Sequence, residues 1–173
     1  LRDSAAPTAG PVPRVSIVVP ARDEARGIEA AVRGFAAQDW PDLEVVVVDD
    51  RSADATPSIL ARLAAELPRL RVLTVRELPP GWLGKNHANA LGGEAATGEW
   101  LLFTDADVVL APDAVARAVG HAERRGLDHL AVAPQVRMPG TLLPQFVLYF
   151  GLMFLLFVRP WAARNPHSRA AVG

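Results

Sequence analysis

The stretch LEVVVVDDRSADATPSIL, residues 43–60, changes from a strand pattern to a helix pattern within a few residues. Residues 43–48 are rich in valine and form a short apolar run, which is typical of a buried strand. Residues 53–67 carry apolar side chains at helical spacing, and Pro57 suits the first turn of a helix. The stretch therefore predicts a strand, an acidic loop and a helix in that order.

The same alternation recurs along the chain from Val15 onward. Strands that are apolar on both faces and separated by helices indicate a parallel sheet covered on both sides. We therefore predict a three-layer α/β/α fold with a mostly parallel, Rossmann-like sheet over residues 14–135, after a Pro-rich linker at residues 1–13. The predicted strands are residues 15–19, 43–48, 71–75, 99–104 and 129–134, and the predicted helices are residues 24–38, 53–67, 85–96 and 112–125.

Composition limits the kinds of partner and site. The chain has 173 residues, half of them hydrophobic, and its 18 basic and 19 acidic residues give a net charge of −1. A charge balance so close to zero argues against a nucleic-acid-binding surface. There are no cysteines, so any metal site must use oxygen or imidazole ligands.

Acidic residues follow three of the predicted strands, at the edge of a parallel sheet where ligands bind. A single acid there is readily explained as a helix cap or a solvated side chain, but three acidic strand ends together indicate a site. Burying two unpaired carboxylates is costly, so the acids of the last group should lie near solvent, a cation or both. The groups are Asp23 and Glu24, Asp49 and Asp50, and Asp105 and Asp107.

The loop sequences of this chain do not match those of three common classes of protein with parallel sheets. A dinucleotide-binding dehydrogenase needs G-x-G-x-x-G after its first strand, where this chain has PARDEARG, residues 20–27. A P-loop needs four residues between its glycine and Gly-Lys-Ser/Thr, whereas GWLGKN, residues 81–86, has two and ends in asparagine. A phosphoacceptor receiver domain would not explain PPGWLGKNHA, residues 79–88.

The chain combines an acid pair after the second predicted strand, a lysine before a helix and an Asp-x-Asp motif after a later strand. This combination resembles the family 2 glycosyltransferases, which are inverting enzymes of the type A glycosyltransferase fold. The matching segments are VSIVVPARDE at residues 15–24, VVVVDDRSADAT at 45–56 and GKNHANALGGEAATGEWLLFTDADV at 84–108. PPGWLGKNHA is most similar to the branch that includes carotenoid and lipid glycosyltransferases. The resemblance implies transfer of a sugar from a nucleotide-sugar donor, with UDP as the commonest nucleotide among relatives.

The resemblance also suggests roles for the acids. Asp107 would bind a divalent cation, Mn²⁺ or Mg²⁺, because hard cations that bridge phosphates prefer carboxylate ligands. Asp105 would hold the ribose or assist the metal through water. Asp50 would accept a hydrogen bond from the nucleobase, with Asp49 supporting the loop.

The remaining donor-binding candidates lie in two loops. Lys85 precedes a predicted helix whose N-terminus favours anions, so we expect it to meet the pyrophosphate. Trp82 could line the site or pack on its own domain, and His87 fits an ordinary position at a helix start. Arg22 could meet phosphate or form a surface pair with its acidic neighbours. In relatives, the loop that packs against the nucleotide corresponds here to Pro20, Ala21, Arg22 and Glu24.

The general base of an inverting transfer has no candidate here. In the resembled family that carboxylate follows the Asp-x-Asp motif at some distance, yet no Asp or Glu occurs after Asp128. We therefore expect the donor-binding part of a longer enzyme, shortened at both ends, with residues 136–173 beginning the acceptor half. The alternative is a nucleotide-binding module without catalysis of its own.

An apolar run, FVLYFGLMFLLFV at residues 146–158, contains no charged residue. It is shorter than the ~20 residues of a membrane-spanning helix. Either of two roles would suit it: a membrane-interface helix near a lipid acceptor, or a helix covered by further protein, including a second copy of the chain in a homodimer. With the first role, the protein would be membrane-associated with its active site facing the cytoplasm.

Overall fold

The computed structural model of the protein describes residues 11–132, 140 and 142–158. The chain divides into two compact units, Leu1–Gly126 and Leu127–Gly173. The first unit contains the sheet and four helices, and the second contains the helix α5 (Leu142–Val158).

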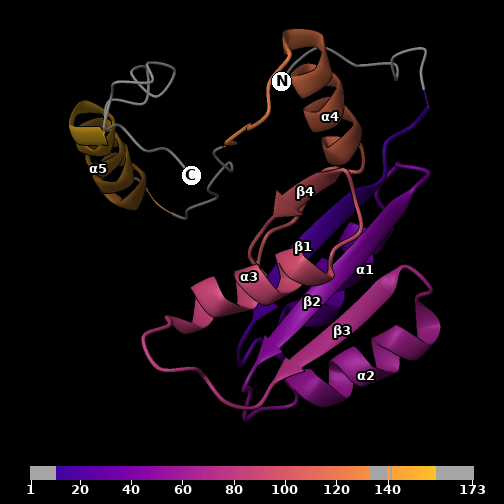
Figure 1. The fold of residues 1–173 in the computed structure, drawn as a ribbon. Coiled ribbons are helices and arrows are strands. Elements are labelled where there is room, and N and C mark those ends of the chain that lie inside the picture. Colours follow the sequence, from indigo (N-terminus) through magenta and orange to yellow (C-terminus); the bar gives the residue numbers. More distant parts are fainter. Residues whose placement is uncertain (1–10, 133–139, 141, 159–173) are drawn as a thin grey trace. The chain divides into compact units, whose positions relative to one another are not determined.

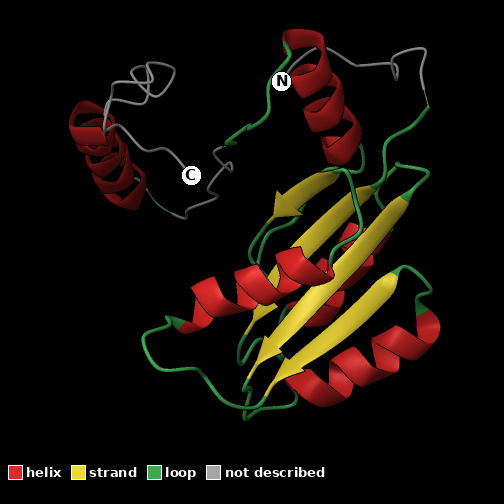
Figure 2. Ribbon diagram, viewed as in Figure 1, coloured by secondary structure: helices red, strands yellow, loops and turns green. Residues whose placement is uncertain are grey.

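Four strands form one parallel sheet in the first unit (Figure 2). They are β1 (Val15–Ala21), β2 (Leu43–Asp50), β3 (Leu70–Val75) and β4 (Trp100–Phe103), in the spatial order β3-β2-β1-β4. Each strand is followed by a helix, namely α1 (Ile28–Ala36), α2 (Thr56–Glu66), α3 (Gly84–Ala95) and α4 (Ala114–Arg125). The predicted α/β class and parallel sheet are confirmed.

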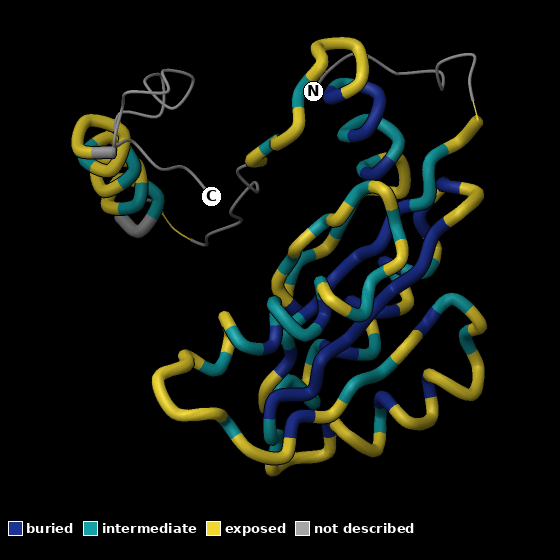
Figure 3. Tube along the Cα trace, in the orientation of Figure 1, coloured by how far each residue is buried: buried dark blue, intermediate teal, exposed yellow. Residues whose placement is uncertain are grey.

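Helices cover the sheet on both faces, with α3 in front of the strands and α1 behind them in Figure 1. Because side chains alternate along a strand, the odd and even residues of β2 face different helices. Val45 and Val47 pack with residues of α1 and α2, whereas Val48 packs with Ala88 of α3. Both faces of the central strands are buried, as the dark blue segments of Figure 3 show.

Proline is unusual in a central strand because it lacks the N–H that a ladder needs. Pro20 lies in β1, which has β2 on one side and β4 on the other. The carbonyl of Val18 accepts from Thr104 on the β4 side, and residues two apart face the same neighbour. The nitrogen of Pro20 therefore faces the β4 side, beyond Phe103 where that ladder ends. Pro20 therefore removes no hydrogen bond from the ladder between β1 and β4.

Helix boundaries near the sheet edge differ from the prediction because loop backbone groups bond to side chains instead. α1 begins at Ile28 rather than residue 24, since the amides of Glu24 and Ala25 donate to Thr56 and Asp54. β2 extends through Asp50, two residues further than predicted, because β3 provides pairing partners for both acids.

The predicted fifth strand at residues 129–134 is wrong for its described part. Residues 129–132 are not in a strand, and residues 133 and 134 lie outside the described part of the chain. Apolar composition favours a strand only where a neighbouring strand pairs with its backbone. Within the described sheet, no strand pairs with residues 129–132.

A buried polar network fixes the turn before β4 at the end of the sheet where its strands begin. Glu44 Oε1 accepts from the Ser16 hydroxyl at 2.5 Å and from the Thr97 amide at 2.6 Å. The amide of Gly98 in turn donates to Ser16 Oγ at 2.8 Å. Burial opposes ionisation of Glu44, but the hydrogen bonds from Ser16 and Thr97 outweigh it and hold the pKa of that carboxyl below its ordinary value.

The apolar run predicted at residues 146–158 lies in α5. Within the described residues, no helix combines the length and the apolar character needed to cross a membrane. Nine large apolar side chains of α5 are exposed: Phe146, Leu148, Tyr149, Phe150, Leu152, Phe154, Leu155, Leu156 and Phe157.

Candidate nucleotide-sugar site

One hollow at the carboxyl ends of the strands collects most of the predicted site residues. Its volume is about 330 Å³. The ends of β1 and β2, the loop after β4 and the N-terminus of α3 all contribute to its wall, which is expected where parallel strands end and a helix begins. The lining residues are Pro20, Ala21, Arg22, Glu24, Asp50, Gly84, Lys85, Asp105, Ala106 and Asp107.

The two carboxylates after β4 are exposed and flank a buried residue, Ala106. Lys85 Nζ lies 2.6 Å from Asp105 Oδ1, so a cation does accompany the pair, as the sequence suggested. The side chains of Lys85 and Asp105 are 60% and 54% exposed, so water screens the contact strongly. Asp107 has no ion pair among the described residues, which leaves its carboxylate available to a ligand.

Asp50 is the buried acid of the site, at 4% exposure. Two hydrogen bonds join its carboxylate to Arg51, from Nε to Oδ1 at 2.8 Å and from Nη2 to Oδ2 at 3.0 Å. These bonds, supported by the nearby positive charge of Arg22, hold the pKa of Asp50 below its ordinary value. The pair is a charge-assisted contact of the stronger kind.

Asp49 does not line the hollow because side chains alternate along β2. Asp50 reaches α3, since a Cβ added to Gly84 would overlap Asp50 Oδ2. Asp49 therefore faces the α1 and α2 side, where its Oδ1 accepts from the Ser52 amide at 3.3 Å. The geometry gives Asp49 a bond within its own loop.

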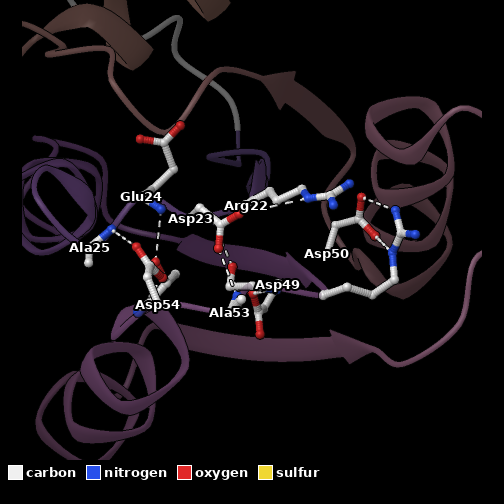
Figure 4. Close-up of polar contacts among 11 residues, drawn as sticks. Arg22, Asp23, Glu24, Ala25, Asp49, Asp50, Ala53 and Asp54 are labelled. Carbon is white, nitrogen blue, oxygen red and sulfur yellow. Dashed lines mark hydrogen bonds and ion pairs between the residues drawn. The ribbon is translucent and has the colours of Figure 1, made fainter.

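The loops after β1 and β2 are joined by reciprocal hydrogen bonds, drawn as dashed lines in Figure 4. The Asp23 amide donates to Ser52 Oγ at 3.0 Å, and Asp23 Oδ1 accepts from the Ala53 amide at 2.7 Å. Asp54 Oδ2 accepts from the Ala25 amide at 3.0 Å in the same way. These contacts fix the loop that carries Arg22 and Glu24 against the loop that follows Asp50.

Three other residues give mixed outcomes. Arg22 lines the hollow, and its Nε lies 3.9 Å from Asp23 Oδ2 with both side chains about half exposed, so neither predicted role for Arg22 is excluded. Trp82 and His87 are not among the lining residues. Their rings meet edge to face at 5.4 Å between centroids, which is a local contact between neighbours.

Sequence reasoning missed the loop contacts of Asp23 and Asp54 and the position of Gly84. A signal for Gly84 was present, since a glycine directly before Lys85 at a helix start permits close approach of the backbone. The partners of Asp23 and Asp54 are about 30 residues away along the chain, so no local pattern could identify them.

The site suits a metal that is shared between protein and ligand. In the described part of the chain, no three His, Cys, Asp or Glu side chains gather around a possible metal position. Asp105 and Asp107 nevertheless line one hollow with Lys85. Hard cations such as Mg²⁺ commonly take one or two carboxylates and fill the remaining positions with substrate phosphates and water. The residues present therefore fit a cation that arrives with a diphosphate.

Proteins with similar sequences include a succinoglycan biosynthesis protein and a glucosyltransferase. The succinoglycan biosynthesis protein ExoO of Rhizobium meliloti is 35% identical over 159 residues, covering 82% of this chain and 44% of that protein. The GalNAc(5)-diNAcBac-PP-undecaprenol beta-1,3-glucosyltransferase of Campylobacter jejuni is 29% identical over 135 residues, covering 78% of this chain and 42% of that protein. The chain thus spans less than half the length of these relatives.

A solved structure shares the fold. The mannosyltransferase PcManGT from Pyrobaculum calidifontis, in complex with GDP-Man and Mn²⁺, matches with a TM-score of 0.58 and 40% identity over 64% of this chain and 32% of that one. The sheet and helices described above are thus those of the type A glycosyltransferase fold. A family model, Glycosyl transferase family 2, matches residues 16–161. The chain belongs to the family 2 glycosyltransferases.

Proposed function

We propose that this chain supplies the donor-binding part of an inverting, metal-dependent glycosyltransferase. The observation that carries the proposal is the single hollow that contains Asp50, Lys85, Asp105 and Asp107. A nucleotide-sugar has a base at one end and a diphosphate near the other. The buried acid Asp50 suits the base, and a lysine with two exposed acids suits the diphosphate.

At the base end, Asp50 would accept a hydrogen bond from a ring N–H. Its carboxylate is ionised and fixed by Arg51, so little side-chain motion is needed for binding. The loops around it are held by the contacts of Asp23 and Asp54, which support the same preorganisation. Pro20, Ala21 and Glu24 also line the hollow and would pack against the nucleotide.

At the diphosphate end, Lys85 would bind phosphate oxygens at the N-terminus of α3. The first turn of α3 has no side-chain cap, so its free N–H groups favour an anion. Asp105 holds the Lys85 amine at 2.6 Å and would also meet the ribose or a metal-bound water. Asp107 would hold Mn²⁺ or Mg²⁺. The cation, when bound, neutralises the charge that develops on the leaving diphosphate.

The donor proposed is a nucleoside-diphosphate sugar. The expectation of a UDP sugar stays a prediction, and the relative from Pyrobaculum calidifontis is in complex with GDP-Man. Transfer also needs a general base for the acceptor hydroxyl. Because no Asp or Glu follows Asp128 in the sequence, we assign donor binding rather than proton abstraction to this chain.

Calorimetric titration of the chain with UDP-glucose, UDP-GlcNAc and GDP-mannose tests donor binding. At least one of these donors should bind with Mn²⁺ present and bind about 10-fold or more weakly after chelation, because the diphosphate then loses a shared cation. Adenosine provides the control, since it has no diphosphate. Binding that is equal with and without metal would contradict the metal-dependent proposal, and no binding of any nucleotide-sugar would contradict donor binding itself.

We also propose that α5 lies at a membrane surface and places the protein near a lipid acceptor on the cytoplasmic side. Its exposed apolar side chains and the absence of charge over residues 142–158 support this, as does the undecaprenol in the name of the Campylobacter jejuni relative. A homodimer through residues 146–158 is the alternative use of the same surface.

Charged substitutions in α5 distinguish membrane binding from dimerisation. The double substitution Leu152→Lys and Leu155→Lys should abolish flotation of the full-length protein with neutral phosphatidylcholine vesicles, because charged side chains resist burial among acyl chains. Lys substitutions at the exposed residues Ala61 and Ala64 of α2 are the charge-matched control. If the variant still floats, or if the wild type does not float with vesicles and is instead a dimer that the double substitution converts to a monomer, the membrane proposal is wrong.

A further inference from the structure

Arg51 adopts a backbone conformation that arginine rarely occupies. Its φ is +59°, in the left-handed region that favours glycine, asparagine and aspartate. Asp23 has a similar φ of +56°, but its residue type tolerates that region and its carboxylate bonds to the neighbouring loop. An arginine held in such a conformation beside a ligand site suggests a function for its side chain.

Two of the three nitrogens of the Arg51 guanidinium form hydrogen bonds within the protein. Nε and Nη2 bind the two oxygens of Asp50. Among the described residues, Nη1 has no hydrogen bond, so its two N–H groups remain available as donors. The Arg51 side chain is 27% exposed, whereas that of Asp50 is 5% exposed. The pair therefore presents free donors next to a fixed acceptor.

Gly84 lies against this pair, of which Asp50 lines the hollow and Arg51 stands directly behind it. A Cβ added to Gly84 would overlap Asp50 Oδ2 and lie 3.1 Å from Arg51 Nη2. Gly84 itself lines the hollow together with Asp50. The backbone at the start of α3 thus lies against the Asp50 and Arg51 side chains.

We propose that Arg51 is a residue that determines base specificity, selecting bases in which a ring N–H adjoins a carbonyl. Asp50 accepts from the ring N–H while an Arg51 N–H donates to the adjacent carbonyl oxygen. Uracil and guanine present this pair of groups. This inference rests on the proposed function, since it assigns a partner to the base of the same donor.

Cytosine is the informative comparison because it differs from uracil only at this edge. Cytosine has an unprotonated ring nitrogen where uracil has N3–H, and an amino group where uracil has a carbonyl. With the diphosphate end held, the cytosine nitrogen would oppose the Asp50 carboxylate and the amino group would oppose the Arg51 guanidinium. Both contacts are unfavourable, and both groups of the protein are left unpaired.

The test is calorimetric titration of the chain with UDP, CDP, GDP and ADP in the presence of Mn²⁺. In the wild type, UDP should bind about 10- to 100-fold more tightly than CDP, or GDP more tightly than ADP by the same ratio. Arg51→Lys keeps a positive charge beside Asp50 but loses the two-pronged geometry, so this ratio should fall several-fold, toward the discrimination that Asp50 alone provides. Arg51→Asn, which tolerates a positive φ, should lower the ratio as well.

Arg76→Lys is the matched control, because Arg76 is exposed and follows β3 at the same edge of the sheet. It should leave the ratio at its wild-type value. Equal binding of keto and amino nucleotides by the wild type would overturn the inference. So would an Arg51→Lys variant that keeps the ratio or weakens both nucleotides equally. If the wild type binds no nucleotide, the proposed function fails instead.

Discussion

Asp107→Asn should weaken Mn²⁺-dependent binding of a nucleotide-sugar by about 100-fold, close to 3 kcal/mol of binding free energy. The substitution keeps the shape of the side chain but removes the charge that a hard cation requires. Asp107 is exposed, and Lys85 pairs with Asp105 rather than with Asp107. The loss should therefore appear in titrations with Mn²⁺, while the residual binding without metal should be unchanged.

Asp113→Asn is the matched control for Asp107→Asn. Asp113 is also an exposed acid after β4, but it does not line the hollow and its carboxylate lies 3.6 Å from Arg117. The control should bind the donor with wild-type affinity in the same titration. Equal affinities for wild type and Asp107→Asn in Mn²⁺ would remove Asp107 from the metal site, and equal losses in both variants would indicate a general effect of charge.

Gly98→Ala should lower the free energy of unfolding by about 3 kcal/mol, because overpacking and broken buried hydrogen bonds act together there. A Cβ at this position would lie 2.6 Å from both the amide nitrogen and Oγ of Ser16, and 2.9 Å from the carbonyl carbon of Val15. Two of these three atoms belong to the backbone of a central strand and cannot move aside. The Gly98 turn would have to shift and lose its bond to Ser16.

Urea denaturation followed by circular dichroism measures this change. Gly34→Ala is the control, because a Cβ there would meet nothing within 4 Å and the position lies in α1. Since alanine is the better helix former, Gly34→Ala should raise the free energy of unfolding by about 0.5–1 kcal/mol. A Gly98→Ala variant as stable as the wild type would show that the turn before β4 can relax without cost.

Local patterns in the sequence determined the α/β class and most of the elements. The valine runs of β1 and β2 are apolar on both faces, and only a sheet covered on both sides buries such runs. The same patterns misplaced the start of α1 and suggested a strand over residues 129–134. In both cases the outcome depended on whether the backbone finds hydrogen-bond partners distant in sequence, such as the Asp54 side chain for the Ala25 amide.

The sequence by itself also determined which residues gather at the candidate site, because parallel strands place their carboxyl ends at one edge. It indicated Asp50, Lys85, Asp105 and Asp107 as candidates, and all four line the hollow. Only the tertiary structure decided how their charges are arranged. Asp105 pairs with Lys85 from another element, and Asp50 pairs with Arg51, whose backbone takes a positive φ. The first contact depends on the distance between two separate loops and the second on a local backbone conformation, and residue spacing along the chain encodes neither.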